Sequence, residues 1–129
     1  MSTYLLDSTV LVAHMRGDLG DLLPRLHAGG HEIATSCVNV AELVRGLRPE
    51  ERKAATFFLG RLRFLPTGRE GATRAGNYIA EWSRRGRTIE IPDALVAGTA
   101  REHGAIIVTQ NTKDFPMGDV RVELPSPAE

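Results

Sequence analysis

The chain has 129 residues, 42% of them hydrophobic and 25% charged, and its formal net charge is zero, as in an ordinary soluble globular protein. Its apolar runs are far shorter than the roughly 20 residues that a membrane-spanning helix needs, and its single cysteine, Cys37, excludes an intrachain disulfide. Asp7 interrupts the first apolar stretch too early for a signal peptide, and we therefore expect a cytoplasmic protein.

The first half of the chain is predicted to alternate between strands and helices. The expected elements are a buried strand at residues 4–6, helices at 10–15 and 19–27, and a second strand at 32–35. Ser36 is expected to cap the next helix. The residues that recur in that helix at the spacing of a buried stripe are Val40, Leu43, Val44 and Leu47.

The second half continues the same alternation. The expected elements are a helix from Pro49, a short strand at 63–66, helices at 69–85 and 91–103, and strands at 105–109 and 120–124. The residues expected to face the core from the 69–85 helix are Ala72, Ala75, Ile79 and Trp82. The 105–109 strand is apolar without alternation, which is typical of a central parallel strand that is covered on both faces.

This order of elements predicts the fold class. Strands that alternate with helices imply an α/β fold with helices on both faces of a mainly parallel sheet, here of four to five strands. We expect a single domain over residues 1–124 and a flexible tail over residues 125–129.

Four acidic residues fall where such a sheet would bring them to one edge: Asp7, Glu42, Asp93 and Asp114. Ligands of open parallel sheets bind beyond the carboxyl ends of the strands. Asp7 ends the first strand, and Asp114 lies in the loop that leaves the 105–109 strand. Each acid also has an ordinary structural explanation, as a helix cap for Asp7, as a first-turn anion for Asp93 and as a loop residue for Asp114.

Glu42 is the acid whose direction can be worked out from its helix. With Val40 taken as zero and about 100° per residue, the apolar stripe lies within about 60° of Val40, whereas Glu42 lies near 200°. Its side chain therefore points either to solvent or, because the helix leaves the second strand at Ser36, into a cleft at the same sheet edge.

A cluster of these carboxylates would need a cation. Neighbouring carboxylates raise one another's pKa, and a hard ion such as Mg²⁺ or Mn²⁺ relieves their repulsion. The four acids are therefore predicted to be both metal ligands and catalytic residues of a nuclease. The polar residues predicted to orient the carboxylates or water are Ser8, Ser36, Thr109 and Asn111. Cys37 has no evident base beside it and is expected to be a small buried residue.

The charge distribution supports a polyanionic substrate. Between Arg45 and Arg87 the chain has eleven Lys and Arg residues against four Glu, so this segment carries +7 and the two ends together −7. Basic side chains beside an acidic metal site suit a phosphodiesterase, although any one arginine is also explained as part of a solvated helix face. The arginines predicted to contact a substrate or partner are Arg45, Arg84, Arg85 and Arg87.

The sequence resembles PIN-domain ribonucleases, and in particular VapC-type toxins of toxin–antitoxin pairs. The resemblance covers nearly the whole chain in four segments: Tyr4-Leu5-Leu6-Asp7-Ser8-Thr9-Val10-Leu11, Ser36 to Gly46, Pro92-Asp93-Ala94-Leu95-Val96-Ala97, and Thr109-Gln110-Asn111-Thr112-Lys113-Asp114-Phe115. Two positions depart from the family pattern. Thr9 stands where Asn is common, and Asn111 stands where some relatives carry an acid, which leaves open whether Asp114 or Asn111 completes the site.

The resemblance implies a three-layer α/β/α fold and Mg²⁺- or Mn²⁺-dependent cleavage of RNA, leaving a 5′-phosphate and a 3′-hydroxyl. It also implies a homodimer that a small VapB-like antitoxin inhibits, and it gives the ligand roles to Asp7, Glu42, Asp93 and Asp114. The four arginines named above would then contact RNA or antitoxin.

Three other functions would account for part of this pattern. A PIN nuclease of RNA processing that is not a toxin would share the whole site, and an upstream reading frame for a small antitoxin would separate the two. A phosphorylated receiver domain would need an Asp at the end of its third strand, where this chain has Pro66-Thr67-Gly68. A non-catalytic RNA- or protein-binding module would not need a full acidic set.

Overall fold

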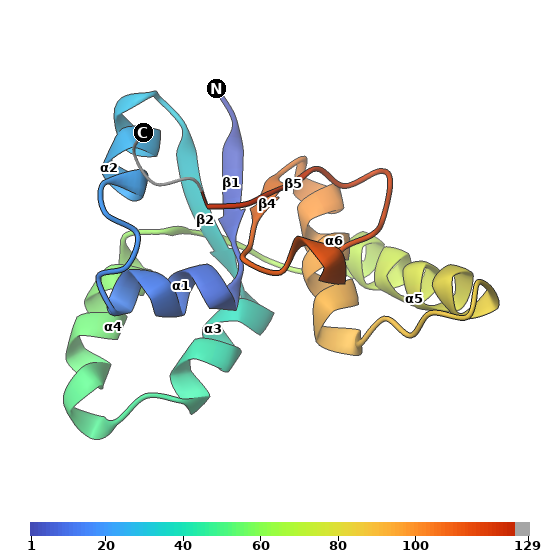
Figure 1. Cartoon of the computed structure of the whole chain (residues 1–129), viewed down its shortest axis with the longest axis horizontal. Coiled ribbons are helices and arrows are strands. Elements are labelled where there is room, and N and C mark those ends of the chain that lie inside the picture. Colours follow the sequence, from blue (N-terminus) through green and yellow to red (C-terminus); the bar gives the residue numbers. More distant parts are fainter. Residues whose placement is uncertain (126–129) are drawn as a thin grey trace.

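The computed structural model describes residues 1–125 and contains a five-stranded sheet with helices on both faces (Figure 1). Its strands are β1 (Thr3–Leu6), β2 (Glu32–Ser36), β3 (Arg63–Leu65), β4 (Ile106–Val108) and β5 (Val122–Glu123). Its helices are α1 (Ser8–Met15), α2 (Leu22–Ala28), α3 (Cys37–Arg45), α4 (Arg52–Gly60), α5 (Arg69–Arg84) and α6 (Ile91–His103), with short 3-10 turns at Pro49–Glu51 and Thr112–Asp114.

All four strand pairs are parallel, and the sheet order is β3-β2-β1-β4-β5. The chain therefore builds the sheet outward from β1 in one direction through β2 and β3, and then returns to the other side of β1 for β4 and β5. The predicted α/β class, the parallel sheet and the number of strands are confirmed.

The strand side chains alternate between two separate cores. Leu5 and Ile107 lie in the core beneath α5 and α6, whereas their neighbours Leu6 and Val108 lie in the core formed with α1 and α2. Figure 1 shows α5 and α6 on one side of the strands and α1, α2 and α4 on the other, with α3 at the lower end of β2. Apolar residues on both faces of β1 and β4 thus produce the three layers.

The close crossing of α5 and α6 corrects one prediction. Gly71, Ala75 and Tyr78 are the buried residues of α5, whereas the predicted Ala72 is exposed. A Cβ atom on Gly98 of α6 would collide with the backbone of Gly71, so the two helices touch where neither has a side chain. The other predicted residues do face this core, because Ala75 is buried in it and Ile79 and Trp82 pack against it.

Other differences from the sequence prediction lie mainly at element ends. Helix α1 begins at Ser8, directly after Asp7, and α2 begins only at Leu22. Strand β5 is confined to Val122–Glu123. Cys37 is exposed instead of buried, because it opens α3 on the side away from the core. Within residues 1–125, none of the helices combines the length and hydropathy that a membrane-spanning segment needs.

The predicted boundary at residue 124 stays a prediction, and residues 126–129 of the predicted tail lie outside the described residues.

Candidate active site at the carboxyl edge of the sheet

The strand order creates a crevice beside β1. The sheet order reverses at β1, because β2 and β3 lie on one side of it and β4 and β5 on the other. Open α/β sheets bind ligands at such reversal points. Leu6 pairs with Val108 in the sheet, so Asp7 and Thr109 follow the two strands side by side. Asp7 also donates its backbone N–H to the carbonyl of Val108, at 2.9 Å.

The Asp7 carboxylate is buried, with 6% of the residue exposed, and is held from three segments. Thr109 Oγ1 donates to Asp7 Oδ2 at 2.8 Å, Asn39 Nδ2 donates to Oδ1 at 3.0 Å, and Thr9 Oγ1 lies 3.4 Å from Oδ2. Asp7 occupies the N-cap of α1, yet its side chain makes no capping hydrogen bond. The carboxylate is thus positioned toward the crevice and is not used to begin a helix.

Burial governs the protonation of Asp7. Loss of solvent raises the pKa of Asp7 above its ordinary value, and the Glu42 charge raises it further, whereas the hydrogen bonds from Thr109 and Ser8 act in the opposite direction. A buried carboxylate of this kind is more stable with a positive charge beside it.

Asn39 is a site residue that the sequence prediction missed. It is completely buried, donates to Asp7, and accepts a hydrogen bond of 2.5 Å from Ser36 Oγ. Ser36, predicted to orient the carboxylates, therefore acts on Asp7 through Asn39 and makes no side-chain cap for α3. One signal was present in the sequence: Asn39 lies three residues before Glu42, on the same side of the helix.

Glu42 lies half-buried on α3, and Ser8 Oγ donates to its Oε1 at 2.9 Å. Ser8 begins α1, so this bond ties the first helix to the third at the sheet edge. Of the two directions left open for Glu42, the structure selects the cleft, because Glu42 lines a hollow together with Ser8 and Thr9.

Asp93 receives the combined negative charge of the other acids. Burial raises its pKa to about 6, and the charges of Asp114, Asp7 and Glu42 add to that rise, in this order. Asp114 is thus the acid with the greatest electrostatic effect on Asp93. Asn111 is exposed, and only its backbone N–H reaches the site, donating to Thr109 Oγ1 at 3.1 Å.

The four acids are close enough to affect one another electrostatically, but they do not form a complete set of metal ligands. Within residues 1–125, no three Asp, Glu, His or Cys side chains are close enough together to hold one ion as they stand. The charges of the other acids still act on Asp93, so these acids lie near one another. Both observations fit a cation that is held partly through water molecules, as Mg²⁺ usually is. The oxygen-only donor set and the mutual repulsion of the acids both fit a hard divalent cation.

The four arginines predicted to contact a substrate or partner differ in their surroundings. Arg85 pairs with Glu81 at 3.1 Å and lies 4.5 Å from the centre of the Trp82 ring, while Arg87 donates to the carbonyl of Lys113. Arg84 is exposed at the end of α5. Arg45 alone among the four lines the hollow that contains Glu42.

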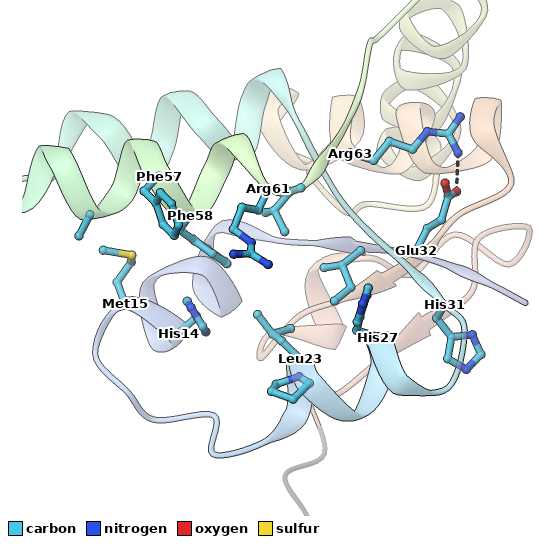
Figure 2. Close-up of a pocket in the computed structure, with 14 residues that line it drawn as sticks. His14, Met15, Leu23, His27, His31, Glu32, Phe57, Phe58, Arg61 and Arg63 are labelled. Atoms are coloured by element: carbon cyan, nitrogen blue, oxygen red, sulfur yellow. Dashed lines mark hydrogen bonds and ion pairs between the residues drawn. The ribbon is translucent and has the colours of Figure 1, made fainter.

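A larger groove, of about 800 Å³, lies away from the carboxylates between α1, α2 and α4. Figure 2 shows Phe57 and Phe58 of α4 on one side of it and Leu23 on the other, with His14 stacked on Phe58 at 4.1 Å. None of the four predicted acids lines this groove. The predicted acidic site and this groove are therefore separate features of the molecule.

Comparisons with known proteins identify the family of the chain. The PIN domain family model matches residues 4–117. Ribonuclease VapC10 of Mycobacterium tuberculosis is 36% identical over 115 residues, covering 88% of this chain and 86% of that protein. The tRNA(fMet)-specific endonuclease VapC of Shigella flexneri is 30% identical, covering 95% of this chain and 98% of that protein.

A solved structure gives the same result for the fold. The DNA-bound VapBC structure from Salmonella typhimurium superposes with a TM-score of 0.85 at 24% identity, covering 98% of this chain and 100% of that chain. The match of the family model over most of the chain, together with these relatives, establishes that the chain belongs to the PIN-domain family, among the VapC ribonucleases.

Proposed function

We propose that the chain is an endoribonuclease toxin of a toxin–antitoxin pair, which hydrolyses phosphodiester bonds of RNA at the crevice between β1 and β4. The observation that carries this proposal is the buried Asp7 carboxylate, which three side chains hold at the sheet edge where the charges of Glu42, Asp93 and Asp114 meet. Relatives named as ribonucleases and endonucleases, at 30–36% identity over most of the chain, support the same activity.

PIN-domain ribonucleases use divalent metal ions in general, and we assign the ligand role here to Asp7, Glu42, Asp93 and Asp114. Mg²⁺ or Mn²⁺ is the ion expected from the oxygen-only set. A cation bound there supplies Lewis acidity, which lowers the pKa of water and offsets negative charge on the phosphate oxygens.

The surrounding residues prepare the carboxylates for this task. Thr109 and Asn39 fix both oxygens of Asp7, and Ser8 fixes one oxygen of Glu42, so neither carboxylate needs to reorganise when the substrate arrives. Asp93, with a pKa of about 6, must release its proton to bind a cation, and cation affinity is therefore expected to rise with pH.

We further propose a small VapB-like antitoxin as partner, homodimerisation, and assembly of toxin and antitoxin into a hetero-oligomer. The solved structures with this fold include a toxin–antitoxin complex from Klebsiella pneumoniae. A cytoplasmic location is proposed from the single cysteine. An RNA-processing nuclease without an antitoxin is the alternative, and co-purification with the product of a neighbouring small gene distinguishes the two.

The activity is tested by digesting total RNA with the purified protein in Mg²⁺, in Mn²⁺ and in chelator. We expect cleavage only with metal, and a loss of about 100-fold or more in Asp7→Ala and Asp93→Ala, because each removes a ligand. Glu70→Gln, an exposed acid on α5, is the matched control and is expected to cut normally. Cleavage in chelator, or full activity in both site variants, would contradict the proposal; RNA binding without cleavage would indicate a binding module.

A further inference from the structure

A second hollow, of about 380 Å³, adjoins the carboxylates. It shares a wall with them, because Ser8, Thr9 and Glu42 line it, and these residues also form the hydrogen bonds around Asp7 and Glu42. Its volume lies at the lower end of the range of small-ligand sites, about 300–1,000 Å³.

Two of the residues that line the hollow carry groups suited to bind phosphate. Arg16, at the end of α1, and Arg45, at the end of α3, both line it. Within residues 1–125 neither guanidinium forms an ion pair, although many other arginines do. Guanidinium groups match phosphate oxygens with several donors in a fixed plane.

Two further polar residues define what else the hollow can recognise. Gln110 follows the strand end at Thr109, and its neutral amide offers two donors and one acceptor. Single-stranded RNA exposes base edges that such groups read directly. Asp18 also lines the hollow and is expected to weaken the binding of an anion there.

From these features we infer that the hollow binds one nucleotide of single-stranded RNA next to the cleaved bond, with its phosphate on Arg16 and Arg45 and its base edge on Gln110. This inference rests on the proposed nuclease function and adds where the substrate lies. It also divides the basic residues, since Arg45 contacts RNA while Arg85 and Arg87 are held by Glu81, Trp82 and the Lys113 carbonyl.

The test uses the full chain and a fluorescent single-stranded RNA oligomer that the wild type cuts. We expect Arg16→Ala and Arg45→Ala each to weaken RNA affinity and raise KM by about threefold to tenfold, with kcat nearly unchanged. Each is also expected to lower the salt dependence of binding by about 0.7 in log–log slope. Arg69→Ala, an exposed arginine on α5, is the matched control and is expected to bind RNA like the wild type.

Two further variants are expected to change RNA affinity or base preference in ways that a general loss of positive charge or of folding would not. Asp18→Asn is expected to tighten RNA binding by about twofold to threefold, because it removes a negative charge from the hollow. Gln110→Ala is expected to leave the salt slope unchanged while relaxing the base preference at one position beside the cut by about fivefold. Thermal unfolding of each variant confirms that the fold is intact.

The outcomes separate this inference from the nuclease function. If the wild type cuts no RNA, the proposed function fails first. If the wild type cuts but Arg16→Ala and Arg45→Ala bind and cut like Arg69→Ala, the nucleotide site is overturned while the nuclease stands. Unchanged RNA affinity together with lost binding of a cognate antitoxin would assign the hollow to the protein partner and would equally overturn the inference.

Discussion

The substitution Asn39→Asp tests the buried support of the catalytic carboxylate. Asn39 is fully buried and donates from Nδ2 to Asp7 Oδ1 at 3.0 Å. The change adds no volume, but it replaces the N–H donor with a second carboxyl group directly against Asp7. Ser36 Oγ can still donate to position 39, so the Asp7 contact is the interaction that changes.

The expected cost depends on pH. Two charges about 3 Å apart repel by roughly 5 kcal/mol at an effective dielectric constant of 20, so the new carboxyl group keeps its proton instead. Its folded pKa is thus raised above its unfolded value of about 3.9, and stability is lost as pH rises toward the folded pKa. We expect a loss of about 1 kcal/mol near pH 5, where the protonated acid donates to Asp7, and about 4 kcal/mol at pH 8.

Urea unfolding in chelator, at pH 5 and pH 8, measures both values against the wild type at the same pH. Asn77→Asp, at an exposed position of α5, is the matched control and is expected to change stability by less than about 0.5 kcal/mol at either pH. A loss below about 1 kcal/mol at pH 8, or an equal loss at both pH values, would refute the proposed contact between Asn39 and Asp7.

Two further substitutions test other features, both by urea unfolding. Asp93 has a folded pKa of about 6, raised from 3.8, so the metal-free wild type loses stability as pH rises through this interval. Asp93→Asn is therefore expected to be about 1 kcal/mol more stable than the wild type at pH 8 in chelator, after allowance for solvent screening. In saturating Mg²⁺ the variant is expected to lose this advantage, because the ion stabilises the wild type. A pH-independent difference would contradict it. Gly98→Ala, which drives a methyl group into the Gly71 backbone, is expected to cost about 3 kcal/mol or more, whereas Gly76→Ala, in open space on α5, is expected to stabilise by about 0.5–1 kcal/mol; similar effects of the two would show that α5 and α6 do not touch.

The sequence prediction of the fold depended on the spacing of apolar residues and on the positions of strand ends. The apolar runs around Leu5 and Ile107 specify strands covered on both faces, and the sheet order follows from parallel strands joined by helices. The close contact between α5 and α6 could not be predicted in the same way. The buried face of a helix is predicted from the spacing of its large apolar side chains. The contact between Gly71 and Gly98 instead depends on the absence of side chains on two helices at once.

In the candidate site, too, some residues could be predicted from local sequence and others only from the assembled fold. The positions of Asp7 and Glu42 follow from one strand end and one helix angle, which are local properties. Asn39 was missed because a polar residue on a helix is ordinarily solvated, and only the placement of α3 across the end of β1 buries it. The pairing of Arg85 with Glu81 and Trp82, and the position of Arg45 in the hollow, likewise require the assembled fold.

The bond from Thr109 to Asp7 spans 102 residues of sequence and has a consequence for synthesis of the protein. Translation produces β1 and Asp7 first, and it produces β4 and Thr109 only after β2, β3 and the helices between them. A nascent chain that lacks β4 has neither the strand beside β1 nor the hydroxyl that holds Asp7 Oδ2. The two halves of the site are therefore made at different times, and Asp7 is held in place only once β4 has paired with β1.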